Sequence, residues 1–201
     1  QERRAKEERR RLKILEVASF FPPYGGEFCL DQARALQMLG HDVTIIAPVQ
    51  LSIRKSRARF FTMPYGEHRF EMEGVRVWRR FTHGIPKVIR PNVEHWIQVC
   101  VAMIERYIAE CGKPDIIHAH CGKWAGCAAR IIRQRHGVPY VLTEHLAIFD
   151  VEKELQLTGG SKSWEIPMLT EAYREASLVM PVSCELVSQM KPFFGDDYRW
   201  R

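Results

Sequence analysis

The sequence predicts a single α/β domain with a Rossmann-like, doubly wound and mainly parallel sheet that carries helices on both faces. Short continuous apolar runs, which are typical of strands buried on both faces, recur along the 201 residues. Stretches with apolar residues at helical spacing lie between these runs. Strands that alternate with helices of this length imply right-handed βαβ crossovers, and the chain length suits one well-filled domain.

Five continuous apolar runs and one alternating run are the expected strands. The continuous runs are residues 12–18, 43–47, 115–118, 140–143 and 178–182. Pro181 belongs at a strand end, because proline cannot donate a hydrogen bond to a sheet. The alternating run, residues 75–78, predicts a half-exposed or edge strand.

The expected helices follow these strands. They span residues 27–39, 92–111, 123–136, 164–176 and 185–190. In the first of them Leu30, Ala33 and Leu36 share one face, and Gly40 follows as a helix C-cap should. Residues 49–74 show no clean period and predict a long irregular insert, which in a compact domain is usually functional or mobile.

Charge and cysteine content restrict the class of protein. The formal net charge is +6, with arginine concentrated in residues 3–13 and 54–59, and such a balance favours polyanionic partners or a solvated basic surface. No run of about eighteen apolar residues occurs, and residues 1–11 lack the apolar core of a signal peptide. The six cysteines are scattered and form no CxxC pair. We therefore expect reduced thiols and a cytoplasmic protein.

A glycine loop, FPPYGGEFCL, joins the first strand to the first helix, an arrangement that binds phosphate in many folds. The pair Gly25 and Gly26 does not form GxGxxG, no acidic residue ends the second strand, and no Gly-Lys-Ser/Thr follows. NAD binding and ATP-dependent phosphate transfer are thus poorly supported. The helix N-terminus can still meet an anion or a sugar hydroxyl, or the glycines simply form a tight turn.

Two histidines end a central strand in PDIIHAHCGKWAG. His118 and His120 face the same side, because side chains alternate along a strand. Together with Cys121 they could bind zinc, although a fourth ligand at a familiar spacing is absent. The alternative is a hydrogen-bonded structural histidine, and His118, inside the apolar run, fits that role better.

Polar residues also end the next strand, in VPYVLTEH. Thr143, Glu144 and His145 should reach the same edge of the sheet as His120, and two adjacent polar strand ends favour a binding site there. Glu144 should point away from whatever His145 faces. The alternative is that Glu144 and His145 only solvate a loop.

Four segments in order resemble the N-terminal domain of family 4 glycosyltransferases, which have the GT-B architecture. They are KILEVASFFPPYGGEFCLDQARALQMLGHDVTIIAP, PDIIHAH, VPYVLTEH and EAYREASLVMPVSCEL. The resemblance implies two Rossmann-like domains that face each other across a cleft, and sugar transfer with retention of configuration and without a required metal. It also implies residues 12–191 as the N-terminal domain after a charged extension (1–11), and 192–201 as the start of a linker to an absent C-terminal domain. The isolated chain should then be inactive.

The resemblance assigns roles to particular residues. His145 matches the histidine that contacts the donor sugar, and would be catalytic. The glycine loop beside the donor diphosphate and the acceptor comprises Gly25, Gly26 and Glu27. Acceptor-binding candidates are His120, Cys121, Lys123, Glu144 and Arg174, the last as a phosphate contact.

The expected partners follow from the same resemblance. They are a nucleotide-sugar, bound mainly by the absent domain as a co-substrate, and a saccharide or glycolipid acceptor; we expect no cofactor, no metal and no nucleic acid. The segment from Arg54 to Phe61 combines charge with apolar side chains, which suggests peripheral contact with the inner face of a membrane. Two alternatives stay open: a nucleotide-sugar epimerase of the same architecture, and a non-catalytic module that binds polyanions.

Overall fold

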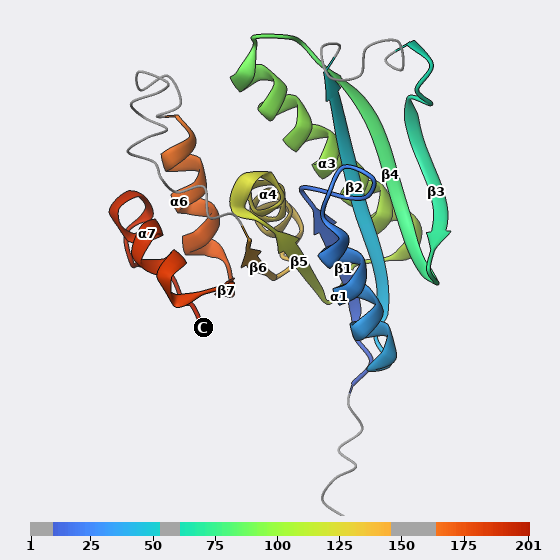
Figure 1. Ribbon diagram of the computed structural model, residues 1–201. Coiled ribbons are helices and arrows are strands. Elements are labelled where there is room, and N and C mark those ends of the chain that lie inside the picture. Colours follow the sequence, from blue (N-terminus) through green and yellow to red (C-terminus); the bar gives the residue numbers. More distant parts are fainter. Residues whose placement is uncertain (1–9, 53–60, 146–163) are drawn as a thin grey trace, which may run out of the picture.

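The computed structural model of the chain describes residues 10–52, 61–145 and 164–201. Figure 1 shows one twisted sheet with helices packed on it. Its strands are β1 (Lys13–Ala18), β2 (Asp42–Ser52), β3 (Gly66–Met72), β4 (Val75–Gly84), β5 (Ile116–His120), β6 (Tyr140–Glu144) and β7 (Leu178–Pro181). Its helices are α1 (Glu27–Met38), α3 (Ile89–Cys111), α4 (Cys127–His136), α6 (Glu165–Glu175) and α7 (Cys184–Phe194), and a wide turn, η3 (Gly122–Gly126), precedes α4.

The described strands form one sheet in the order β3-β4-β2-β1-β5-β6-β7. Neighbouring strands are parallel except β3, which runs antiparallel to β4. The chain builds outward from β1 through β2 to β4 and then crosses back to lay β5 on the other side of β1. The junction of β1 and β5 is therefore the point where the strand order reverses, and open α/β sheets bind their ligands there.

Helices cover both faces of the sheet, as the continuous apolar strands predict (Figure 1). Leu15 and Val17 of β1 join the larger core cluster, beneath α3, α4, α6 and α7. Ile14 and Ala18 of the same strand join the smaller cluster, beneath α1. The predicted doubly wound, mainly parallel α/β fold is confirmed.

The expected irregular insert, residues 49–74, is partly strand, so that prediction is wrong where the chain is described. β2 continues to Ser52 in register with Gly84, and β3 forms a hairpin with β4 through Glu73 and Gly74, which both have positive φ. The edge of the sheet is therefore β3. Of the two alternatives for residues 75–78, a half-exposed or an edge strand, the edge strand is wrong, because β4 lies one place inside the edge. β3 carries many polar residues because an edge strand meets water, which made its sequence look like a loop. Residues 53–60 lie outside the described part.

Several helix boundaries also differ from expectation, and α3 begins at Ile89, three residues before the expected start. The helix expected from residue 123 begins at Cys127, because Lys123 leaves helical geometry inside η3. Gly122 in this turn leaves no room for a side chain, because a Cβ there would lie 2.5 Å from Tyr173 Oη. The last helix runs on to Phe194 and includes Pro192. Beyond it, the amide of Arg201 donates to the carbonyl of Val179, so the end of the chain packs on β7.

No described helix is both long and apolar enough to cross a lipid bilayer.

Candidate active site at the carboxyl ends of β1, β5 and β6

The carboxyl ends of three adjacent strands meet at one edge of the sheet. Ala18 of β1 pairs in register with His120 of β5, which pairs with Thr143 of β6. The glycine loop leaves β1 at this edge, and His145 follows β6 directly. The structure thus brings the glycine loop, His120 and His145 together, as the sequence predicts.

The glycine loop requires glycine in one of its two positions for space as well as for conformation. Gly25 and Gly26 have φ of 96° and 83°, which L side chains rarely adopt. A Cβ at Gly26 would lie 2.2 Å from the carbonyl oxygen of Phe20, whereas one at Gly25 would meet nothing within 4 Å. α1 starts directly afterwards at Glu27, with its N-terminus at the edge of the sheet. The loop is therefore a tight turn that also presents a helix N-terminus, and contact with an anion or a sugar hydroxyl there stays a prediction.

A buried carboxylate lies beneath this loop, on β1. Glu16 is fully buried, and its Oε2 lies 2.6 Å from Nε2 of His120 and 3.0 Å from Nδ1 of His118. Burial raises the pKa of Glu16, but the charge and hydrogen bonds of the two histidines outweigh burial and bring the pKa to about 2. Glu16 is therefore a carboxylate at neutral pH, buried between two imidazoles.

The histidines extend this cluster towards the edge of the sheet. His118 Nε2 lies 2.7 Å from the hydroxyl oxygen of Thr143, and His120 Nδ1 lies 3.4 Å from Nε2 of His145. The His145 ring stacks on Phe28 of α1, with 3.9 Å between the ring centroids. Polar groups thus run from Glu16 through His120 to His145, which is half-buried beside the start of α1. We call Glu16, His118, His120 and His145 the histidine row.

The donor set of Glu16, His118 and His120 suits a metal ion in composition, and is the candidate set among the described residues. The sequence suggested Cys121 in place of Glu16, but Cys121 is not part of it. Two ligands on a tetrahedral zinc ion lie about 3.3 Å apart, given bonds of about 2.0 Å. The 2.6 Å between Glu16 and His120 is too short for that and matches a direct charge-assisted hydrogen bond. We therefore assign these contacts to hydrogen bonding.

Burial also changes the pKa of His145. Burial first, and then the neighbouring His120 and His118, lower the pKa of His145 to about 4. Its ring is thus neutral near pH 7, when it can accept one hydrogen bond and donate another.

Glu144 lies on the opposite face of β6. Its Oε2 accepts hydrogen bonds from the amide of Gly122 at 2.8 Å and from the hydroxyl of Tyr173 at 2.7 Å. Glu144 is fully buried, so the alternative in which it merely solvates a loop is wrong. The prediction that Glu144 points away from His145 is confirmed.

The other candidates are spread more widely. The Cys121 thiol is buried, and burial raises its pKa well above the usual range. The Nζ of Lys123 lies 2.6 Å from Oε2 of Glu165, with which it forms an ion pair. Arg174 is exposed on α6 and pairs with Asp197 at 3.2 Å. None of these three side chains belongs to the histidine row.

Sequence reasoning missed Glu16 and Phe28. Glu16 had a signal, because a carboxylate inside a continuous apolar run is costly to bury without partners. Phe28 had none, since a phenylalanine at the start of a helix is ordinary core material. Its contact with His145 depends on how α1 lies against β6.

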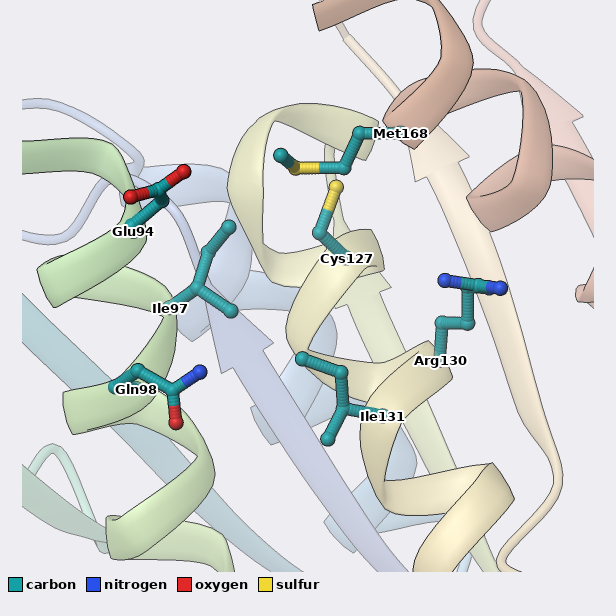
Figure 2. A pocket seen from close by; sticks show the side chains of 7 residues that line it. All are labelled: Glu94, Ile97, Gln98, Cys127, Arg130, Ile131 and Met168. Atoms are coloured by element: carbon teal, nitrogen blue, oxygen red, sulfur yellow. The ribbon is translucent and has the colours of Figure 1, made fainter. Parts of the chain in front are cut away.

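A separate cavity of about 170 Å³ lies between α3, α4 and α6 (Figure 2). Its lining is Glu94, Ile97, Gln98, Cys127, Arg130, Ile131 and Met168. Ile97 and Cys127 belong to the core cluster on the other face of the sheet from α1. The cavity is therefore distinct from the histidine row.

Comparison with known proteins gives a consistent result. Residues 25–201 match the glycosyl transferase 4-like domain family. The chain is 29% identical over 197 residues to the putative teichuronic acid biosynthesis glycosyltransferase TuaC of Bacillus subtilis (strain 168). The aligned region covers 92% of this chain and 48% of TuaC. The chain thus spans about half the length of this curated relative.

Solved structures show the same fold. Sucrose-phosphate synthase from Thermosynechococcus elongatus superposes with a TM-score of 0.71 at 15% identity, covering 95% of this chain and 47% of that one. A shorter chain of the same enzyme gives a TM-score of 0.63 at 13% identity, covering 94% of this chain and 86% of that one. At such identities the likeness concerns the fold alone.

Proposed function

The chain belongs to the glycosyl transferase 4-like domain family, and from this premise we propose that it is the acceptor-side half of a two-domain glycosyltransferase. In this proposal residues 12–191 form one wall of a cleft, and residues 192–201 lead towards a second domain that binds most of the nucleotide-sugar. The enzyme transfers a hexose-like sugar to a saccharide or glycolipid acceptor with retention of configuration. The observation that carries the proposal is the meeting of His145 with the N-terminus of α1 at the point where the strand order reverses.

The chemistry of sugar transfer suits this arrangement. Positive charge develops at the anomeric carbon and negative charge on the leaving diphosphate, and the partial positive charge of a helix N-terminus stabilises the latter. The start of α1, with Gly25, Gly26 and Glu27, is the candidate for that contact. His145 is neutral near pH 7, so it can orient a sugar hydroxyl by accepting its hydrogen bond.

The acceptor side is assigned to the residues that follow β5 and β6. His120 and Glu144 are buried, so we propose that both support the acceptor wall from behind. Cys121 is buried as well, so in this proposal it also lies behind the acceptor wall. The side chain of Lys123 is less exposed than that of Arg174. Arg174 is the candidate for an acceptor phosphate.

The experiment that tests the proposal uses the full-length protein with a panel of nucleotide-sugars and acceptors. His145→Ala should lower kcat about a hundredfold and change the acceptor KM about twofold or less, because the contact strengthens at the transition state. Equal changes in both parameters would limit His145 to a binding role. Conversion of the donor without any acceptor would point to an epimerase instead.

We also propose peripheral contact with a membrane. Of the segment from Arg54 to Phe61, only Phe61 is described, and its side chain is 82% exposed. An exposed aromatic side chain next to basic residues suits an interface rich in anionic lipid. Sedimentation with vesicles should depend on anionic lipid and weaken in Phe61→Ser; binding that is equal for neutral vesicles would contradict this proposal.

A further inference from the structure

The hydrogen bonds of the histidine row determine which nitrogens carry protons. A carboxylate only accepts hydrogen bonds, so the ring nitrogens that face Glu16 must both donate. These are Nδ1 of His118 and Nε2 of His120. The other nitrogen of His118, Nε2, lies 2.7 Å from the hydroxyl oxygen of Thr143.

The proton on His145 is determined by its contact with His120. Because His120 donates through Nε2, the Nδ1 of its neutral ring is an acceptor. That atom faces Nε2 of His145 at 3.4 Å, and two facing nitrogens need one proton between them. The proton belongs to His145, since burial lowers the pKa of His120 and keeps its ring neutral. Within residues 10–52, 61–145 and 164–201, Nδ1 of His145 has no hydrogen-bond partner, and it is the nitrogen left for a ligand.

We propose that Glu16 and His120 are positioning residues that hold His145 as its Nε2–H tautomer, so that Nδ1 accepts a hydrogen bond from a hydroxyl of the sugar substrate. The hydrogen bond that His145 Nε2–H donates to Nδ1 of His120 fixes the position of one edge of the His145 ring. Stacking on Phe28, with 25° between the ring planes, fixes the tilt of the ring. The inference rests on the proposed function, because the sugar is the substrate of that transfer. The tautomer itself can be measured without it.

The cost of burying Glu16 supports a role beyond stability. Its neighbours Leu15 and Val17 on the same strand are apolar and fully buried. Replacing a buried ionic cluster by apolar residues often leaves the stability of a protein unchanged or increases it. Folding stability alone therefore does not require a carboxylate at this position. Glu16 lies where β1 meets β5, below the partly exposed His145. This location suits a carboxylate that positions the residues of the site.

A double-mutant cycle in the full-length enzyme tests whether Glu16 and His120 act through His145. Glu16→Gln and His120→Gln should each lower kcat about tenfold with the acceptor KM changed about twofold or less. His120→Gln keeps a donor towards Glu16 but loses the acceptor that faces His145. In a His145→Ala background, either substitution should cost about twofold or less, because the group that it positions is gone. Full tenfold losses in that background would mean a merely structural role and would overturn the proposal.

Nitrogen-15 NMR of this 201-residue chain tests the tautomer without any turnover. His145 Nε2 should carry a proton and show a through-hydrogen-bond coupling to Nδ1 of His120, and His120→Gln should abolish that coupling. Thr143→Val is the matched control, because it removes a hydroxyl from the His118 branch and should leave the His145 signals unchanged. An unprotonated His145 Nε2 would overturn the proposal. Absence of sugar transfer in the full-length protein would instead refute the proposed function.

Discussion

At the scale of single residues, two adjacent glycines in the same loop meet different constraints. Gly25 and Gly26 share a positive φ, but only Gly26 lies against backbone, where a Cβ would come 2.2 Å from the Phe20 carbonyl oxygen. Conformation alone therefore explains Gly25. Close approach of the loop to the end of β1 explains Gly26 in addition, and it fixes where α1 begins.

Alanine at these two positions should separate the two costs. Gly25→Ala should lower the free energy of unfolding by about 1 kcal/mol, the cost of a left-handed L residue. Gly26→Ala should lower it by roughly 3 kcal/mol, because Phe20 must also move. Urea denaturation of both variants measures the difference, and equal losses would show that the contact with Phe20 does not constrain the loop.

At the scale of elements, Arg79 of β4 ties the glycine loop to the sheet. Its Nη2 donates to the carbonyl oxygen of Pro22 at 2.7 Å, and its guanidinium lies 5.3 Å from the ring centroid of Phe21. A planar fork can make both contacts at once, whereas an ammonium cannot. The order of the loop thus depends on a strand that is distant in sequence.

Arg79→Lys should loosen the loop and leave the charge of the chain unchanged. The amide of Tyr24, which donates to the Phe21 carbonyl, should exchange its hydrogen about fivefold faster, as expected for loss of one hydrogen bond. Arg80→Lys, the next residue on the same strand, is the control and should leave that rate unchanged. Equal rates in both variants would contradict the role given to Arg79.

The histidine row joins β1, β5 and the end of β6, and it links their stability to pH. The pKa of His145 falls from 6.5 to about 4 on folding, so the unfolded chain binds more protons between those values. The pKa of Glu16 falls from 4.5 to about 2, so the stability it contributes is present above pH 4.5 and lost below. Both groups therefore act in the same direction.

The free energy of unfolding should fall as the pH decreases from 6.5 to 4, and fall further below 4.5. His145→Gln should reduce the dependence between pH 6.5 and 4 and leave the Glu16 contribution, which is lost below pH 4.5. Denaturant titrations at half-unit pH intervals measure it. An unchanged slope between pH 4 and 6.5 in His145→Gln would show that the His145 proton is not linked to folding.

At the scale of the whole molecule, the chain is one Rossmann-like unit whose candidate site opens at an edge of the sheet. The family to which it belongs and its span of about half of a curated relative support a cleft with a second wall. In that view the histidine row and the start of α1 supply one side of the reaction, and donor binding depends on the other side.

The 201-residue chain by itself should show no sugar transfer under conditions in which the full-length protein is active. Its affinity for a nucleotide-sugar should be at least about a hundredfold weaker, because the proposed function assigns most contacts of the donor to a second domain. Calorimetry and a product assay on both proteins, at equal concentration, measure this. Transfer by the isolated chain would contradict the proposed division of labour.

Most of the strands could be predicted from the sequence, because a strand buried on both faces is mainly a continuous apolar run, as the run at β1 is apart from Lys13 and Glu16. The same rule failed for β3, since an edge strand exposed to water has the polar composition of a loop. For β4 the sequence left a half-exposed strand and an edge strand open, because alternation reports the exposure of one face and does not show whether another strand lies beyond.

The sequence by itself determined that polar residues stand at the ends of β5 and β6 and that glycines follow β1. Only the tertiary structure decided that Glu16 binds His118 and His120, residues 102 and 104 positions further along the chain. Spacing along a strand reports which face a side chain takes, but its partners across the sheet depend on strand order and register. Here β5 returns to lie beside β1, and that return converts an unexplained buried carboxylate and three histidines into one hydrogen-bonded row.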